Sequence, residues 1–424
     1  MLLWIMATPK VTQTPLAVMT ELRKQGKKRL PASVQKEIDK NKKLKLSTFQ
    51  FAKTFLSSEC ISRHQGRFVI NSFLPPFPSA AYNRMFTNLL SGRKLSPVSA
   101  YIAVTKKCPY NCWHCSFKGR VQSDLPIDKQ FSLIEDLCHL GASIIGFTGG
   151  EPLLHRDIFS LVKKAHDNGA ETILFTTGHS LDVAKAKRLK QSGLWAICFS
   201  LDSHIPEIHN KLRGYPNAFN EVMEAIKTAR KSGLYTMVSS VATPEFMKEK
   251  CYVAIYDLVK KMHVNEYRII EAMSCGKLLN NVQNIITKQE VRELRNFHRR
   301  VNLASPPTKV CAFNQIESPE LFGCGAGTQH LFIDNAGEVC PCDFTPLSFG
   351  NITQIPLVDI WQKMNQAFSL PRRHCFIQAN YKLIAEKVRE NNFEVPLKAE
   401  DSMEICRNCP FDEMPDYFKI VCNH

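Results

Sequence analysis

Residues 99–115 read SAYIAVTKKCPYNCWHC, and this stretch decides the fold class. Its first seven residues form an apolar run with the length of one strand. The next ten carry Cys108, Cys112 and Cys115 in the spacing C-x-x-x-C-x-x-C. A short strand that is apolar on both faces is typical of a parallel sheet covered by helices. The cysteines would then follow the carboxyl end of a strand, where βα barrels place their active residues.

The chain repeats this pattern after residue 115. Further strand-like runs lie at 143–148, 172–177, 196–202, 235–243 and 266–272. Helical patterns occupy 128–140, 156–168, 181–192, 218–232, 247–261 and 288–302. Within 218–232, Phe219, Val222 and Ile226 share one helical face. Six strand–helix units predict an α/β fold, with a partial (βα)6 TIM-like barrel over residues 98–305.

The three clustered cysteines predict a metal site. The sequence holds 16 cysteines in spaced sets and opens without the charged n-region of a signal peptide, so metal binding is favoured over a disulfide framework. Three thiolates can bind three irons of a 4Fe-4S cubane and leave the fourth iron open for a chelating ligand. A structural zinc site with His114 as the fourth ligand is the alternative.

Further motifs at strand ends make the sequence resemble the radical S-adenosylmethionine (SAM) superfamily. After the second strand come Gly149, Gly150, Glu151 and Pro152, which look like that family's GGEP motif. The fourth strand ends at Ser200 and Asp202, and Arg213 follows in HNKLRGYP. Thr176-Thr177-Gly178 stands where many relatives have Thr-Asn-Gly. The likeness covers residues 98–305.

The resemblance implies a role for each of these residues, with no catalytic residue assigned beyond the cluster ligands. Cys108, Cys112 and Cys115 would hold a 4Fe-4S cluster whose open iron binds SAM. The GGEP motif would contact the amino group of SAM, because an ammonium needs acceptors and glycine permits close approach. Ser200 and Asp202 would touch the ribose, Arg213 the carboxylate, and the backbone of His114 the adenine. A helix N-cap for the Ser-Asp pair and a surface position for Arg213 are the alternatives.

A second group of cysteines lies within residues 306–424. Cys324, Gly337 and Cys342 resemble the opening of a SPASM or shorter twitch extension, and LFIDNAGEV predicts a hairpin with its turn at 335–337. An apolar helix is expected at 357–368. The resemblance implies a small cysteine-rich α+β domain with at least one auxiliary 4Fe-4S cluster. Its predicted ligands are Cys324, Cys342, Cys406 and Cys409, with a zinc ribbon on the same cysteines as the alternative. A second cluster on Cys311, Cys340, Cys375 and Cys422 stays open.

Residues 1–97 are expected to form a basic helical extension and a linker. The net charge is +16, and in the first 60 residues twelve Lys and Arg face four Asp and Glu. Helices are expected around 13–27 and 47–58. The segment NSFLPPFPS at 71–79 should be extended, because adjacent prolines end a helix, and it is either a packed linker or a substrate lid. The basic arm could contact an acidic peptide, an anionic membrane or nucleic acid, or it could be a solvated surface.

The resemblance implies an oxidoreductase, and no apolar run reaches the roughly 18 residues of a membrane span, so a cytoplasmic enzyme is expected. Reduced flavodoxin or ferredoxin would supply one electron, and SAM would split into methionine and a 5′-deoxyadenosyl radical that abstracts hydrogen from a substrate. A peptide or protein is the first expected substrate, and a small metabolite, cofactor precursor or membrane lipid is the alternative. A cluster- or zinc-binding regulator with a nucleic-acid-binding arm belongs to another class, and the SAM cradle argues against it.

Overall fold

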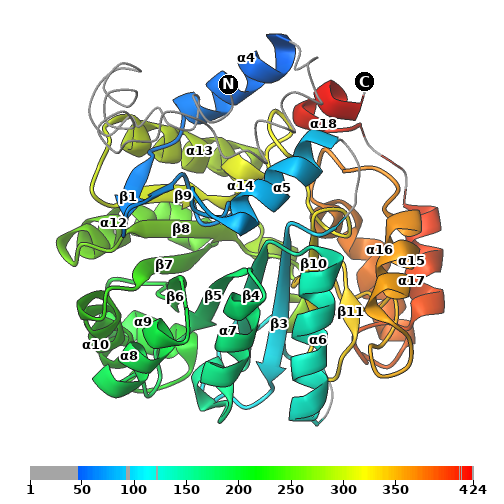
Figure 1. The fold of residues 1–424 in the computed structure, drawn as a ribbon, viewed down its shortest axis with the longest axis horizontal. Coiled ribbons are helices and arrows are strands. Elements are labelled where there is room, and N and C mark those ends of the chain that lie inside the picture. The colour runs from blue at the N-terminus through cyan, green and yellow to red at the C-terminus, as the bar shows by residue number, and fades with distance from the viewer. Residues whose placement is uncertain (1–45, 92–95, 121–122, 410, 412, 423–424) are drawn as a thin grey trace.

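A computed structural model describes residues 46–424 except 92–95, 121–122, 410, 412 and 423–424 (Figure 1). The helix expected around 13–27 and most of the basic extension therefore lie outside the described residues. Within the described ranges, no helix combines the length and apolarity needed to cross a bilayer.

The six predicted barrel strands are present, parallel and in chain order. They are β3 (Ser99–Thr105), β4 (Ile144–Gly149), β5 (Glu171–Thr176), β6 (Ala196–Ser200), β7 (Tyr235–Ala242) and β8 (Glu266–Glu271). The helices predicted between and after them are α6 (Ile127–Leu140), α7 (Ile158–Asp167), α8 (Val183–Gln191), α10 (Ala218–Lys231), α12 (Cys251–Lys261) and α13 (Lys288–Leu303) (Figure 1). The α/β partial barrel predicted from the sequence is confirmed.

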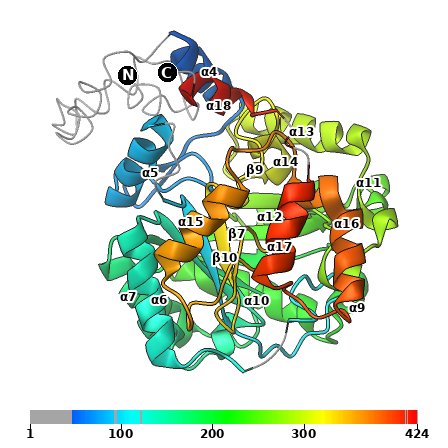
Figure 2. The ribbon, with the colours of Figure 1, turned by 90° about the vertical axis from the view of Figure 1, so that its right-hand side faces the viewer.

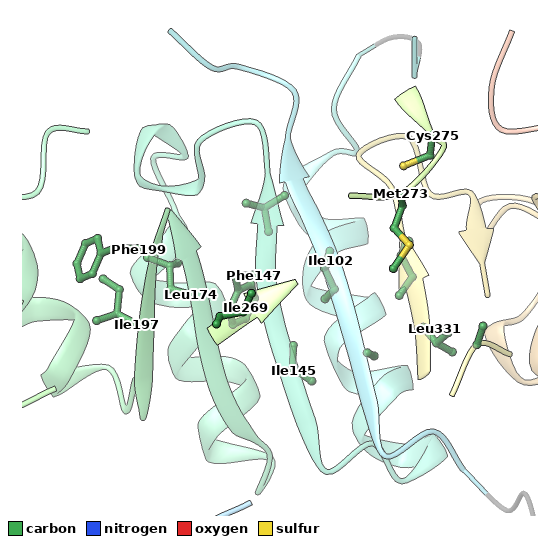
Figure 3. Packing of buried hydrophobic residues seen from close by; sticks show 14 of the residues in the cluster. Ile102, Ile145, Phe147, Leu174, Ile197, Phe199, Ile269, Met273, Cys275 and Leu331 are labelled. Atoms are coloured by element: carbon green, nitrogen blue, oxygen red, sulfur yellow. The ribbon is translucent and has the colours of Figure 1, made fainter. Parts of the chain in front are cut away.

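Both faces of the strands are buried, which explains their continuous apolar sequence. Alternate residues such as Ile145, Phe147 and Leu174 pack in one core with the surrounding helices (Figure 3). The residues between them point into the barrel. At the amino ends of the strands, Ile144 and Ile173 join a separate inner cluster that closes the barrel. Space for a site is therefore left toward the carboxyl ends.

One predicted helix is interrupted. The pattern at 247–261 indicates a single helix, but the structure has α11 (Pro244–Lys248) and α12, separated at Lys250 with φ of 49°. A single left-handed residue does not disturb the apolar period, so the pattern could not show the break. The structure also adds α9 (Pro206–Arg213), which starts at a proline and ends at Gly214 in the left-handed region.

The chain after residue 305 extends the barrel sheet at both edges. β9 (Lys309–Ala312) pairs with β8, and β10 (His330–Ile333) pairs with β3, both in parallel. β11 (Val339–Cys340) pairs antiparallel with β10, which confirms the predicted hairpin, and Gly337 in its turn has φ of 92°. The sheet therefore has nine strands among the described residues.

Helices of the C-terminal region follow these strands. They are α14 (Phe313–Ile316), α15 (Leu357–Ala367), α16 (Phe376–Glu390) and α17 (Ala399–Asn408). The first of them, α14, packs on β8 and β9. α15 confirms the apolar helix predicted at 357–368. α17 packs against both α15 and α16 (Figure 2). The cysteine-rich segment is thus held between the barrel edge and this helical layer.

The region before the barrel packs along its outside. α4 (Leu46–Ser57) confirms the helix predicted at 47–58, and it contacts the last helix, α18 (Asp416–Cys422) (Figure 1). β1 (Ser62–His64) and β2 (Arg67–Val69) form a small hairpin, and α5 (Ala80–Ser91) follows. Between them the segment 71–79 is free of helix, as predicted, and its Phe73 reaches a cavity inside the barrel.

Candidate active site

A cysteine loop, residues 106–118, follows β3. Cys108 is exposed, Cys112 and Cys115 are half-buried, and all three thiols are free. The backbone of the loop is tied to the end of α9, because Asn111 N donates to Arg213 O at 3.1 Å and Trp113 N donates to Leu212 O at 3.1 Å. The loop geometry is therefore fixed by an element about 100 residues away in the chain.

Lys277, after β8, secures the same loop from another direction. Its ammonium donates to Asn111 Oδ1 at 2.6 Å and to Cys112 O at 2.7 Å. Its backbone N–H donates to Cys115 O at 3.1 Å. Next to it, a Cβ on Gly276 would lie 2.3 Å from Cys115 O, so only glycine allows this approach. Sequence reasoning missed both residues, because nothing in their local pattern marks them.

The glycines after β4 admit the cysteine loop. A Cβ on Gly149 would lie 2.4 Å from Thr105 O, and one on Gly150 would lie 2.3 Å from Lys107 O. Gly150 N donates to Thr105 O at 2.7 Å, and Glu151 N donates to Lys107 O at 2.7 Å. These glycines make room for the start of the cysteine loop. The contact with SAM that we expected of them stays a prediction.

The Glu151 carboxylate is completely buried and fully engaged. Leu153 N and Thr176 Oγ1 donate to Oε1 at 3.0 and 2.6 Å. Thr177 donates to Oε2 through its backbone N–H at 2.8 Å and its hydroxyl at 2.7 Å. The two threonines belong to the Thr176-Thr177-Gly178 sequence, so this departure from the usual family pattern supplies donors to Glu151. The side chain joins β4 to β5.

Asp202 and Arg213 form a buried ion pair beside the cysteine loop. Arg213 Nη2 lies 2.7 Å from Asp202 Oδ2, and Arg213 Nη1 lies 3.9 Å from Cys112 Sγ. Burial is the largest single influence on Asp202 and disfavours its charge, but Arg213, the neighbouring histidines and the Val241 N–H together hold the pKa of Asp202 below its usual range. Ser200 lines the barrel cavity, whereas Asp202 lies behind it and also accepts from Val241 N at 3.0 Å.

His114 sits in the loop between Cys112 and Cys115 and faces the cavity. Burial lowers the pKa of His114 to about 4, so its imidazole is neutral. Three buried polar atoms around this loop have no hydrogen-bond partner within the described chain: His114 Nδ1, Trp113 Nε1 and Arg213 Nε. Buried polar groups are nearly always satisfied, so these atoms indicate room for a polar ligand.

The cavity has a volume of about 280 Å³ and connects the two cysteine regions. Ser200, His114 and Arg213 line it on the SAM-motif side, and Cys324, Cys342 and Cys375 also line it. Its remaining walls come largely from apolar and aromatic side chains. The topology thus brings residues from the barrel and from the C-terminal region to one cavity.

The C-terminal cysteines fall into two neighbouring groups. The thiol of Cys375 donates a hydrogen bond to the sulfur of Cys324. This hydrogen bond lowers the pKa of Cys324 to about 7. Cys342 lies close enough to influence both thiols. Cys406 and Cys409, at the end of α17, are near each other and near Arg372, whose backbone bonds to Cys324. Sequence reasoning had placed Cys375 in another set.

The other C-terminal cysteines lie in separate elements. Cys311 is in β9 beside Glu266, Cys340 in β11 accepts from Arg120 Nη1 at 3.4 Å, and Cys422 is exposed in α18. Within the described ranges, no three His, Cys, Asp or Glu side chains converge as they would around a single metal ion. The thiolates of a 4Fe-4S cluster attach to different irons, so this result bears on single-ion sites.

Comparison with known families fits this geometry. The profile of the Radical SAM superfamily matches residues 102–251, and the SPASM profile, an iron-sulfur cluster-binding domain, matches residues 324–410. The chain carries a Radical SAM domain and a SPASM iron-sulfur domain. It is an enzyme, and its cofactors are SAM, a SAM-binding 4Fe-4S cluster and at least one auxiliary 4Fe-4S cluster.

The radical SAM chain is similar to several characterised proteins. It is 25% identical over 295 residues to an AdoMet-dependent heme synthase of Nitratidesulfovibrio vulgaris, covering 63% of this chain and 80% of that protein. It is 24% identical to an Fe-coproporphyrin III synthase of Methanosarcina barkeri, covering 62% and 73%. Its fold is similar to SAM-bound SuiB of Streptococcus suis, with a TM-score of 0.55, 15% identity and coverage of 69% and 72%.

The residues present fit the cofactors of a radical SAM enzyme. The cysteine loop offers three free thiols and no fourth cysteine, which is the donor set that leaves one iron open. The unsatisfied atoms of Trp113, His114 and Arg213 lie beside it. At the other end of the cavity, Cys324, Cys342 and Cys375 lie together within the matched SPASM region.

Proposed function

We propose that this enzyme reductively cleaves SAM at the cysteine loop and directs the radical at a small substrate bound in the barrel cavity. One observation carries the proposal: His114 and Ser116 of the cysteine loop line the same cavity as Cys324, Cys342 and Cys375. A radical that forms at one end of a largely apolar cavity lies close to a substrate bound in the same cavity, and the bound substrate would help to keep water from it.

In this proposal Cys108, Cys112 and Cys115 are the ligands of the SAM-binding cluster. When bound and reduced by flavodoxin or ferredoxin, the cluster supplies the electron that splits SAM into methionine and a 5′-deoxyadenosyl radical. The protein holds the ligands in place through Lys277, through the end of α9 and through the glycines after β4. Most of these contacts go to the loop backbone, so they fix the loop without engaging Cys108 Sγ or Cys115 Sγ.

The SAM cradle is proposed to consist of His114, the backbone of Gly149, Gly150 and Pro152, Ser200 and Arg213. Arg213 keeps one free buried N–H, at Nε, that could bind a carboxylate. Asp202 would position Arg213 through their ion pair, and Glu151 would position the glycines through its four hydrogen bonds. These two acids support the cradle from behind.

The auxiliary cluster is proposed to use Cys324 and Cys342 together with Cys375, Cys406 or Cys409. The bond between Cys324 and Cys375 supports adding Cys375 to the four cysteines predicted from the sequence. Cys375→Ala should therefore lower the auxiliary iron content of the reconstituted protein, whereas Cys311→Ala, in β9, should leave it unchanged.

The size of the cavity favours a small substrate. Pockets for small molecules usually measure about 300–1,000 Å³. The 280 Å³ cavity would also hold part of SAM on its His114 side, so the space that remains suits a metabolite-sized molecule. The relatives named heme and Fe-coproporphyrin III synthases are themselves named for small-molecule products. A peptide or protein was our first expectation from the sequence. It stays a prediction, because one side chain of such a substrate would also fit in the cavity. The basic N-terminus stays a proposed contact for an acidic peptide or an anionic membrane.

The central experiment measures SAM cleavage. Anaerobically reconstituted protein given dithionite and SAM should form 5′-deoxyadenosine, and Cys108→Ala should abolish it while the auxiliary iron remains. Cys138→Ala, on α6, is the matched control and should retain it. If wild-type protein leaves SAM intact, the proposal fails.

The substrate class is tested with an extract of the source organism. A small substrate predicts that an ultrafiltrate stimulates 5′-deoxyadenosine formation and that protease treatment does not remove the stimulation. Stimulation that stays with the protein fraction and disappears on proteolysis would assign a peptide or protein instead.

A further inference from the structure

Arg268 lies inside the barrel, in the middle of β8, and lines the cavity. The residue is 2% exposed. Its guanidinium carbon lies 4.4 Å from the ring centre of Phe73 and 5.3 Å from that of Phe175. Phe73 comes from the extended segment 71–79, which therefore forms part of the cavity wall.

The guanidinium of Arg268 has no carboxylate partner. Its Nε and Nη1 atoms are buried without a hydrogen-bond partner, and no acid in the described chain lies within ion-pair distance of it. The acid on the same face of β8, Glu266, instead accepts from Ser72 N at 3.2 Å and from Tyr235 OH at 3.1 Å. A buried charge without a partner is strongly unfavourable.

Two other buried arginines show the usual arrangement. Arg120 lies 3.3 Å from Asp334, and Arg213 lies 2.7 Å from Asp202. Both pairs are almost completely buried. Arg268 shares their burial but lacks the acid. Within the described chain its charge is met by the faces of two rings and by Tyr101, which leaves buried N–H donors for an anion from outside.

We propose that Arg268 binds a carboxylate or another oxyanion of the substrate, with Phe73 and Phe175 as apolar walls. The inference rests on the proposed function, since it takes the cavity as the substrate site. A guanidinium presents a planar fork that matches a carboxylate, and its stacking on two rings fixes the direction of that fork. Tyr101 lies beside the guanidinium, and burial raises its pKa to about 12, so its hydroxyl can donate to the same anion.

The test uses small probes and needs no radical step. The reconstituted holoenzyme is titrated with para-fluorophenylacetate and its neutral amide, followed by fluorine NMR. The acid should bind at least about tenfold more tightly than the amide, and Arg268→Met should remove that preference. Arg230→Met is the matched control and should keep it, because Arg230 is a half-buried arginine on α10 that does not line the cavity. Equal binding of acid and amide, or no effect of Arg268→Met, would overturn the inference.

Thermal melting separates an anchor from a structural arginine. Removing an unpaired buried charge should leave the melting temperature unchanged or raise it, so Arg268→Met should be at least as stable as wild type. Arg120→Met should melt lower, because it leaves Asp334 buried without its partner. If both variants melt equally low, Arg268 is structural and the inference fails.

A competition experiment identifies which ligand binds at Arg268. Saturating SAM should leave the acid bound, and displacement by SAM would assign Arg268 to SAM rather than to the substrate. Inorganic phosphate that displaces the acid at lower concentration than acetate would assign a phosphate to the anion. SAM cleavage by wild-type enzyme without any charge preference of the probe would retain the proposed function and reject this inference alone.

Discussion

Glu151 has no lone pair left for a ligand. Four donors from three residues converge on its two oxygens, and two of these donors are backbone N–H groups, of Leu153 and Thr177. A backbone N–H cannot reverse its direction, so the side chain must offer acceptors at both positions. The acid of the GGEP motif therefore links the ends of β4 and β5 through hydrogen bonds.

Glu151→Gln tests this at the residue scale. The amide NH₂ would face at least one backbone N–H, which leaves buried donors unsatisfied and should lower the free energy of unfolding by about 3 kcal/mol. Urea denaturation measures the loss. Glu249→Gln, an exposed glutamate, is the control and should change the value by less than about 0.5 kcal/mol. If Glu151→Gln lowers the free energy of unfolding by as little as the control does, the link between β4 and β5 is dispensable.

The residues that sequence reasoning found and missed differ in one respect. The spacing of the three cysteines marks Cys108, Cys112 and Cys115 in the sequence, and the GGEP motif marks Glu151. Arg268 and Lys277 sit in stretches with no spacing signal, and their roles arise from contacts with Phe73 and Asn111, far away in the chain. Such roles are created by the tertiary fold, so a single sequence cannot reveal them.

At the scale of the element, α9 carries two buried side chains, one helical turn apart, to Asp202. Arg213 pairs with its carboxylate, and His209 Nδ1 accepts from its backbone N–H at 3.2 Å. Because the spacing is four residues, both lie on one face of the helix. The short helix, unpredicted from the sequence, is therefore what joins the end of β6 to the cysteine loop.

This arrangement predicts a dependence on pH. Burial lowers the pKa of His209 from 6.5 to about 4, so the folded state stays neutral while the unfolded chain binds a proton below pH 6.5. Stability is thus lost as the pH falls, by about 2 kcal/mol between pH 7 and pH 5. His209→Asn keeps an acceptor and should reduce the pH slope in urea denaturation by this share, while His114 keeps its own contribution and exposed His204→Asn leaves the slope unchanged. An unchanged slope in His209→Asn would contradict the shift.

The predictability of elements follows their length and burial. Six strands and their helices gave clear apolar runs, since helices cover the parallel sheet on its outside and an inner cluster fills one end. β9, with four residues, carried no such signal, and β10 was predicted only as half of a hairpin. β9 and β10 pair with β8 and β3 because these two strands are the edges of the partial barrel. Which strands form the edges is a property of the whole sheet.

For the whole molecule, the consequence is that the barrel and the C-terminal region share one sheet. Removing everything after residue 305, our predicted domain boundary, would take away β9 and β10 and leave β8 and β3 as edges. Edge strands with unpaired backbone promote aggregation. The same cut would also remove Cys324, Cys342 and Cys375 from the cavity.

A chain that ends at residue 305 should therefore be insoluble or melt without cooperativity, as soluble yield and circular dichroism would show. A chain that ends at residue 409 is the control, because it keeps all nine strands and loses only α18 with the residues that lead to it. Burial of Tyr417 and Phe418 is lost in that control, so it should melt cooperatively with stability lowered by about 3–5 kcal/mol. If the 305-residue chain were soluble and melted sharply, the barrel would be stable without β9 and β10. The shared sheet would then be a contact between two parts that fold independently.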